Sequence, residues 1–450
     1  MKSYCIVVVT LALFAGGCAK QTGPDQSRPA PPLPSAAKGP AVELEVAIFQ
    51  GGYGLDFFER KAQEYAQQKG LEVKVWGNPR IWEQLRTRFV AGDVPDLTWP
   101  GWGMDVWSLV YEGQVQAMDE ELAKPAWDQE KPWKDTFIAS LLERGKYAGH
   151  YYILPFNYNV FAWWYNVKLF QKHGWQPPKT WDELLALCAQ IQAAGIAPLT
   201  FQGHYPDYML RGFFYPWAIS VGGLKAYEDA QNLKPGAWSS PPFLKAAEMI
   251  AELRDKGYFQ KGAMGMEHTQ AQMEFVEGRA AMIPCGTWLY SEMKDQMPPD
   301  FEMDFLRVPA VVGGKGDPTL LHAAPETWIV PAKARHPELG ADLFRYMTSL
   351  QNAKQFVTEK HTLMAIQGSD QVELPHYLAA PARAMREAKA VWHADHTDWY
   401  PQLKEEFESA LAALLNGEIT PQQCVEKMEQ AATKARQDKR LPKHTVHYGE

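Results

Sequence analysis

The chain has 450 residues, of which 46% are hydrophobic and 22% are charged, with 34 Gly and 33 Pro. This composition is ordinary for a folded globular protein and excludes a disordered chain, a collagen-like repeat and a disulfide-dense miniprotein. The length allows about three domains or two large lobes. A formal charge of −8 argues against a nucleic-acid partner, because phosphate binding needs a basic surface. The unusual number is 17 Trp, the one hint of function in the composition.

The N-terminus is typical of a bacterial export signal. Lys2 precedes an apolar run over 5–14, and three small residues, 15–17, come before Cys18. The run is too short to span a hydrocarbon core of about 30 Å as a mature helix. The segment resembles the lipobox of bacterial lipoproteins, so we expect residues 1–17 to be removed and Cys18 to carry a lipid. Cleavage nearby by an ordinary signal peptidase is the alternative.

A proline-rich segment follows the predicted lipidation site. Residues 19–41 contain six Pro and two Gly and few apolar residues. Such a segment forms an extended, semi-rigid tether rather than a packed element. We therefore expect residues 18–41 to hold a folded body away from a membrane, in the periplasm or at the outer face of the cytoplasmic membrane.

Strands and helices alternate in the first part of the body. Apolar patterning predicts strands over 43–50, 71–77 and 96–100, and helices over 55–69, 81–90 and 104–112. This alternation indicates βαβ units and a mainly parallel sheet. Ligands of such sheets bind in loops beyond the carboxyl ends of the strands. Two of these loops, Gln50–Tyr53 and Trp99–Trp102, place aromatic residues beside glycines.

The rest of the body is more helical. Helices are predicted over 180–195, 243–257, 338–356 and 403–437, the last broken near Asn416-Gly417 and Thr420-Pro421. The three cysteines after the signal, Cys188, Cys285 and Cys424, have no short spacing, and we expect small buried side chains with at most one disulfide. There is no internal repeat, and no apolar run after Phe14 is long enough to span a membrane.

Six landmarks in order carry a resemblance to a known family. They are FQGGYG (49–54), AGDVPDL (91–97), LPFNYNVFAWWYNVKLFQKHG (154–174), PPKTWDEL (177–184), FVEGRAAMIPCGTW (275–288) and WIVPAKARHPELGADLFRYM (328–347). Over residues 43 to about 435 the chain resembles the sugar-binding proteins of bacterial ABC importers, close in layout to the maltodextrin-binding type.

The resemblance implies a fold and a domain organisation. The fold is α/β, a two-lobed periplasmic-binding-protein fold of type II, with mainly parallel sheets flanked by helices and a hinged cleft. The lobes would be discontinuous, with 42–155 plus about 304–362 in one and 156–303 plus about 363–450 in the other. It also implies a monomer that captures a carbohydrate, closes by hinge bending and delivers the ligand to the permease subunits of an ABC importer.

A sugar site needs aromatic rings for its C–H faces and fixed polar groups for its hydroxyls. By resemblance, Trp288 in the Gly-x-Trp sequence presents a ring to the cleft, and Trp399 supplies a second one. The other predicted ligand-binding residues are Gln50, Tyr53, Trp99, Trp102, Asn157, Asn159, Tyr205, Asp207, Glu326 and Trp328. Asn159 stands where the maltodextrin-type proteins have a carboxylate, which argues against maltodextrin itself as the ligand.

Some residues of the chain could serve metal binding or catalysis instead. His393, Asp395, His396 and Asp398 could bind a metal, but a polar loop capped by Asp398 is the simpler interpretation. No nucleophile, phosphate-loop or metalloprotease motif is present, so we expect no catalytic residue and no cofactor. Two alternatives stay open. One is an exported glycan-acting enzyme with a carboxylate pair, and the other is a receptor of the same fold for a polyamine or ferric ion.

Overall fold

The computed structural model describes residues 42–448, and the predicted signal, Cys18 and tether lie outside these residues. The first lobe is built on a parallel sheet of order β2-β1-β3, comprising β1 (Glu43–Phe49), β2 (Glu72–Asn78) and β3 (Leu97–Trp99). Helices α1 (Asp56–Lys69) and α2 (Ile81–Ala91) connect the strands and end at Gly70 and Gly92 in the left-handed conformation. The predicted βαβ pattern of this region is therefore confirmed.

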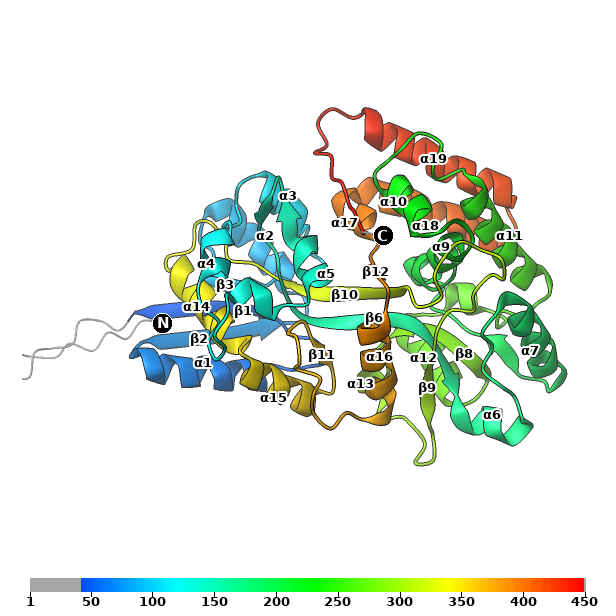
Figure 1. The fold of residues 1–450 in the computed structure, drawn as a ribbon, viewed down its shortest axis with the longest axis horizontal. Coiled ribbons are helices and arrows are strands. Elements are labelled where there is room, and N and C mark those ends of the chain that lie inside the picture. The colour runs from blue at the N-terminus through cyan, green and yellow to red at the C-terminus, as the bar shows by residue number, and fades with distance from the viewer. Residues whose placement is uncertain (1–41, 449–450) are drawn as a thin grey trace, which may run out of the picture. The chain divides into compact units, whose positions relative to one another are not determined.

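Further elements complete the first lobe around this sheet (Figure 1). They are α3 (Val106–Tyr111), α4 (Asp119–Ala123), η1 (Trp133–Thr136), α5 (Ala139–Leu142), η2 (Glu143–Gly145), β4 (Lys146–Tyr147), β5 (His150–Tyr151), α14 (Pro337–Met347) and α15 (Leu350–Lys360). Helix α14 packs on α1 and β3, so a segment late in the sequence completes the lobe that the N-terminal strands begin. The single helix predicted over 338–356 is two helices, because Ser349 ends the first and caps the second.

Strand β6 (Leu154–Asn166) runs through both lobes (Figure 1). It pairs antiparallel with β8 (Ala280–Gly286), β9 (Met303–Leu306), β10 (Leu321–Trp328) and β11 (Leu363–Met364). Parallel pairs of β7 (Ala197–Leu199) with β8 and of β12 (Val391–Trp392) with β10 complete the sheet. The prediction of mainly parallel sheets thus holds for the first sheet and is wrong for this one. Its strands are mixed because the chain crosses between the lobes along β6 and returns along β10 in the opposite direction.

The second lobe surrounds the other end of β6. Its helices before β10 are α6 (Val167–His173), α7 (Trp181–Ala193), α8 (Asp207–Met209), the π-helical turn η3 (Leu210–Phe214), α9 (Tyr215–Gly222), α10 (Leu224–Gln231), α11 (Pro241–Asp255), η4 (Ala263–Gly265), α12 (His268–Val276) and α13 (Leu289–Met293). After β11 come α16 (His376–Glu387), α17 (Asp395–Trp399), α18 (Pro401–Leu415) and α19 (Pro421–Gln437). Helices α18 and α19 pack on each other and on α11, and the predicted break between them is confirmed.

The chain changes lobes at slightly different places from those predicted. Strand β9 pairs with residues 163–166 in the second lobe, and the return to the first lobe is made along β10 rather than near residue 304. Residues 365–367 still hydrogen-bond to residues 136–138 of the first lobe, so the chain leaves that lobe beyond residue 362.

Most of the aromatic side chains are buried in the interior of the protein. Trp133, Trp163, Trp164, Trp217, Trp238 and Trp328 are among the largest fully buried side chains of the protein. Cys188, Cys285 and Cys424 are buried and free, as expected for small apolar side chains. None of the helices in residues 42–448 has the length and apolarity needed to cross a membrane.

Asp96 ties the first lobe together. Its carboxylate accepts the backbone N–H of Glu45 at 2.8 Å and that of His336 at 2.7 Å, and its side chain is buried. A Cβ on Gly340 in α14 would lie 2.2 Å from the carbonyl oxygen of Asp96, so the helix approaches this turn closely. The Pro-Asp turn therefore joins β1, β3 and the start of α14 through one carboxylate.

We expect Asp96→Ala to lower the free energy of unfolding by about 3 kcal/mol, because two buried N–H groups lose a charged acceptor. Urea denaturation followed by circular dichroism measures the loss. Asp93→Ala is the matched control, since Asp93 lies on the surface of the same turn with a side chain 65% exposed. Equal effects of the two substitutions would contradict this role of Asp96.

Candidate functional site

A buried polar cluster lies where β6 and β10 cross between the lobes. Asn159 Nδ2 donates to Glu326 Oε1 at 3.2 Å, and the Thr287 hydroxyl donates to Asn159 Oδ1 at 3.0 Å. The pairing of β6 with β10 is irregular between Pro325 and Thr327, a bulge beside Glu326. Bulges redirect side chains, which places this carboxyl group against Asn159. Residues from three strands thus meet at one point of the hinge sheet.

A second polar group adjoins the first. The Tyr53 hydroxyl is 3.1 Å from Thr362 Oγ1 and accepts from Asn157 Nδ2 at 3.3 Å. The side-chain amide oxygen of Asn157, Oδ1, is buried and has no hydrogen-bond partner among the described residues. Tyr53 comes from the loop after β1, so the predicted Gly-rich loop does reach the hinge strands. A buried acceptor without a partner is costly, and a ligand hydroxyl could satisfy it.

Burial controls the charge of this cluster. Burial raises the pKa of Glu326 to about 8, although the polar side chains of Trp99 and Asn159 act in the opposite direction. Burial and the neighbouring Glu326 raise the pKa of Tyr53 as well. At neutral pH the Glu326 carboxyl group is therefore mainly protonated and can donate a hydrogen bond. The cluster presents neutral donors and acceptors rather than ions.

A cavity of about 280 Å³ lies between the lobes over β10. The first lobe contributes the loop Gly101–Asp105, the hinge contributes His322, Ala324 and Pro325, and the second lobe contributes Arg211 and the start of α18. Trp102 lines this cavity with a side chain that is 62% exposed. The cavity therefore has walls from both lobes and a floor from the returning hinge strand.

Glycines hold Trp102 in this exposed position. Gly101 has a positive φ of 73°, and a Cβ there would lie 2.8 Å from the Phe49 ring. A Cβ on Gly103 would lie 2.4 Å from the Trp82 ring. The backbone on both sides of Trp102 is thus pressed against buried rings, and the intervening indole is left to project into the cavity.

Two arginines of the cavity are paired with carboxylates. Arg144 Nε is 2.5 Å from Asp395 Oδ1, and its Nη2 is 3.0 Å from Asp398 Oδ2. Arg211 Nε is 3.0 Å from Asp207 Oδ1, four residues earlier. Arg211 lies in the π-helical turn η3, a distortion often found at functional sites. Arg144 belongs to the first lobe and its partners to α17, so this ion pair also connects the lobes.

Trp288 stands on the second-lobe side of the hinge. Its ring is half-buried, 6.0 Å from that of Phe161 and 6.3 Å from that of Tyr208. A Cβ on Gly286 would lie 2.0 Å from this indole, so the Gly-x-Trp sequence lets the ring fold back over the strand end. Tyr208 is fixed in turn by His268 Nδ1 at 2.8 Å, and His268 Nε2 is 2.6 Å from Glu292.

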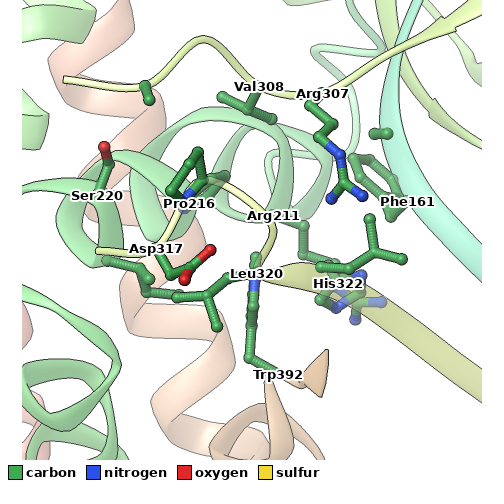
Figure 2. A pocket seen from close by; sticks show the side chains of 15 residues that line it. Phe161, Arg211, Pro216, Ser220, Arg307, Val308, Asp317, Leu320, His322 and Trp392 are labelled. Atoms are coloured by element: carbon green, nitrogen blue, oxygen red, sulfur yellow. The ribbon is translucent and has the colours of Figure 1, made fainter. Parts of the chain in front are cut away.

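A smaller cavity of about 50 Å³ adjoins the interlobe cavity and shares Arg211 and His322 with it (Figure 2). Burial and the nearby positive charges of Arg211, His393 and Arg144 hold the pKa of His322 well below its usual value, so its imidazole is neutral. Figure 2 shows the Arg307 guanidinium directed toward Phe161 and His322, with the Asp317 carboxylate at the opposite end beside Pro216.

Of the twelve predicted site residues, Trp102 lines the interlobe cavity, and four of the others lie away from both the cavity and the polar clusters beside it. Gln50 is exposed at the loop after β1, and the Tyr205 hydroxyl donates to Glu267 at 2.9 Å on the surface. Trp328 is fully buried and packs against Trp99, Phe58 and Phe156 in the first-lobe core. Trp399 is buried with its ring stacked 4.5 Å from His444 of the C-terminal segment. The indoles of Trp328 and Trp399 are already covered by protein in this conformation.

The structure brings the other predicted residues to the hinge. Tyr53, Asn157, Asn159 and Glu326 form the polar clusters, with Trp99 packed beside Tyr53 at 6.4 Å. Trp102 lines the cavity, Trp288 stands beside Phe161, and Asp207 holds Arg211.

Sequence reasoning missed Arg144, Arg211 and His322. Each lies in a segment without a motif, and each gains its place only when segments far apart in sequence meet. The Asp207–Arg211 spacing of four residues was the one available signal, because such a pair shares a helical face. Asp398, expected as a helix cap, binds Arg144 instead.

The histidines of the HADHTD segment contact other protein groups. His396 contacts Tyr215 at 3.0 Å and Gln231 at 3.0 Å, and His393 contacts the carbonyl oxygens of Ala323 and Ser140. Within residues 42–448 no group of three or more His, Cys, Asp or Glu side chains is arranged to hold a metal ion.

We expect Glu326→Gln to stabilise the protein at alkaline pH. Because the folded-state pKa of about 8 lies above the ordinary value of 4.5, the wild type loses stability as the pH rises through that interval. The glutamine variant keeps a polar group but does not ionise. Its advantage should grow by on the order of 4 kcal/mol between about pH 5 and pH 9, measured by urea denaturation. A constant difference across this range would contradict burial of an ionisable carboxyl group.

Comparison with known proteins identifies the family of this chain. The family model described as bacterial extracellular solute-binding protein matches residues 61–384. The chain is 28% identical over 374 residues to the diacetylchitobiose binding protein NgcE of Streptomyces coelicolor, covering 81% of this chain and 79% of that protein. It is 26% identical over 313 residues to the multiple sugar-binding protein of Streptococcus mutans, covering 66% and 69%.

The fold matches that of a solved receptor. The structure of the solute-binding protein RafE in complex with raffinose superposes with a TM-score of 0.68 at 22% identity, covering 87% of this chain and 99% of that one. The two-lobed α/β fold predicted from the sequence is thereby confirmed. The chain belongs to the bacterial extracellular solute-binding protein family, whose members are binding proteins of ABC transport.

Proposed function

We propose that this protein is a receptor that captures a carbohydrate and delivers it to an ABC importer. The observation that carries the proposal is the cavity between the lobes, which residues of both lobes line and into which the exposed Trp102 indole projects. Relatives named for diacetylchitobiose and for multiple sugars support the ligand class.

The chemistry of the cavity suits a neutral polyol. Stacking of Trp102 on one sugar face removes apolar surface from water and contributes about 1–2 kcal/mol. His322, Thr327 and Thr397 line the cavity and offer both donors and acceptors for hydroxyl groups. Several such contacts together reach the 8 kcal/mol or so that micromolar affinity requires.

Charge disfavours the two other receptor types considered. A polyamine site needs several free carboxylates facing the ligand, but the carboxylates that line the cavity are Asp105, which caps α3, and Asp398, which is paired with Arg144. A ferric site needs clustered oxygen ligands such as tyrosines, whereas the aromatic residues that line the cavity are Trp102 and Trp107. The residues at the hinge therefore favour a sugar over a cation, and capture would involve no covalent chemistry.

Hinge bending would couple binding to delivery. The cavity has walls from both lobes, so only the closed conformation can contact both sides of a ligand. A ligand that binds the closed form more tightly shifts the population toward it. The closed surface would then be what the permease subunits of the importer recognise.

A panel of neutral mono- and oligosaccharides tests the proposal. Titration should quench tryptophan fluorescence, and small-angle scattering should show compaction with the same ligand. We expect Trp102→Ala to weaken the best ligand by about 5–30-fold through loss of stacking. Val90→Ala is the control, because Val90 is 89% exposed on α2 of the same lobe. Absence of both signals across the panel would overturn the carbohydrate assignment.

We also propose that the body is anchored by lipid at Cys18 and held by the tether over 18–41. The supporting observations are the small residues before Cys18 and the proline-rich composition after it. Two or more acyl chains suffice for stable membrane attachment.

Replacing the anchoring residue tests this arrangement. We expect Cys18→Ala to move the exported protein from the membrane fraction to the soluble fraction, because no acyl chain can then be attached. Fractionation with immunoblotting measures the change, and Cys188→Ala, a buried thiol in the second lobe, is the control. A membrane-bound Cys18→Ala protein would show that the attachment has another cause.

A further inference from the structure

The small cavity beside the interlobe cavity has a chemical character of its own. It is enclosed by the π-helical turn, α9 and the segment that leads into β10, and it holds about 50 Å³ (Figure 2). One ordered water needs about 10–15 Å³ on this measure, so the space admits a group of several heavy atoms. Arg211 and His322 line both cavities, so the two spaces are neighbours with these side chains between them.

Hydrogen-bond donors stand at one end of this space. Arg307 donates to the carbonyl oxygens of Thr319 at 2.9 Å and Ala384 at 3.4 Å, and it has no carboxylate partner in the described part of the chain. Arg211 uses its Nε for Asp207, the one side-chain hydrogen bond that it makes with a described residue. The remaining N–H groups of these guanidinium groups are available to a carbonyl oxygen of a ligand.

His322 adds an unsatisfied buried group. The residue is 4% exposed, and its Nδ1 has no hydrogen-bond partner within residues 42–448. A neutral imidazole has one donor and one acceptor nitrogen, so it can accept the N–H of an amide. Leaving such a group unpaired costs about 1–3 kcal/mol.

The remaining walls are apolar. Phe161, Leu320 and Trp392 line the space and can cover a methyl group. The charges nearly cancel, since Arg211 is paired with Asp207 and the Asp317 carboxylate lies opposite Arg307. A carboxylate substituent would meet Asp317 and an ammonium group would meet two arginines, whereas a neutral amide meets neither penalty.

We propose that this side cavity receives the acetamido group of a 2-acetamido sugar whose ring lies in the interlobe cavity. The inference rests on the proposed function as a carbohydrate receptor. The carbonyl oxygen accepts from the arginines, the amide N–H donates to His322, and the methyl group packs against Leu320 and Trp392. A hydroxyl group at the same ring position is too short to contact both ends.

Calorimetric titration of the full chain with three disaccharides of one linkage tests the proposal. Diacetylchitobiose carries acetamido groups, cellobiose carries hydroxyls, and deacetylated chitobiose carries amines. We expect diacetylchitobiose to bind about 10–100-fold more tightly than cellobiose, because hydroxyls leave the buried polar groups unpaired. The amine form should bind more weakly than the acetamido form as well, since an ammonium group would lie between two guanidinium groups.

A variant that fills the side cavity distinguishes loss of acetamido recognition from a general loss of sugar binding. Leu320 lines the side cavity and not the larger one, so Leu320→Phe should remove most of the preference for diacetylchitobiose while cellobiose affinity stays within about threefold. Retained cellobiose binding also shows that the variant is folded.

The possible outcomes distinguish the two proposals. Equal affinity of the wild type for diacetylchitobiose and cellobiose would overturn the acetamido site and leave the carbohydrate receptor in place. An unchanged preference in Leu320→Phe would show that the acetamido group is recognised elsewhere, which also overturns this assignment. Failure of the whole saccharide panel would contradict the proposed function itself.

Discussion

Both lobes and the candidate site depend on the pairing of β6 with its neighbours. This single strand carries β8 and β9 at its second-lobe end and β10 and β11 at its first-lobe end. Its side chains from Leu154 to Trp164 are buried, so it can shift little without disturbing both cores. The pairing of β6 with β10 is irregular beside Glu326. The same place holds Asn159 and Thr287, so the polar cluster lies where the two strands cross between the lobes.

Electrostatics at the hinge follow from burial. Taking a carboxyl group out of water favours its neutral form, which explains a Glu326 that donates hydrogen bonds at neutral pH. Two arginines that line the cavity are paired with carboxylates, Arg144 with Asp395 and Asp398 and Arg211 with Asp207. Buried charges are tolerated when they are paired. The cavity therefore combines polar groups with arginines whose charge is balanced by neighbouring carboxylates.

The tryptophans divide into two groups for steric reasons. Trp328 and Trp163 are fully buried between packed elements, and Trp399 is covered by the C-terminal segment that brings His444 onto its ring. Trp102 and Trp288 remain accessible because a glycine beside each lets the backbone approach a neighbouring ring. The count of Trp residues thus indicated neither group, and only the packing around each indole separates them.

The sequence determined the local elements and much of the fold. The hydrophobic period and the capping residues predicted β1 to β3, α1, α2 and the break between α18 and α19 close to their observed bounds. These signals are local, because they act within a few residues. The six ordered landmarks indicated the two-lobed architecture by resemblance. The position of two loops after strands predicted that Tyr53 and Trp102 lie in ligand-binding loops. Local patterns could not reveal that Trp328 is core, that Trp399 is covered, or that β6 pairs mainly antiparallel. Nor could they place Arg144, Arg211 and His322 together, since these residues come from three distant segments. Only tertiary packing decides which side chains share a cavity, because burial, pairing of charges and the pKa of Glu326 arise from contacts between segments that the linear sequence keeps far apart.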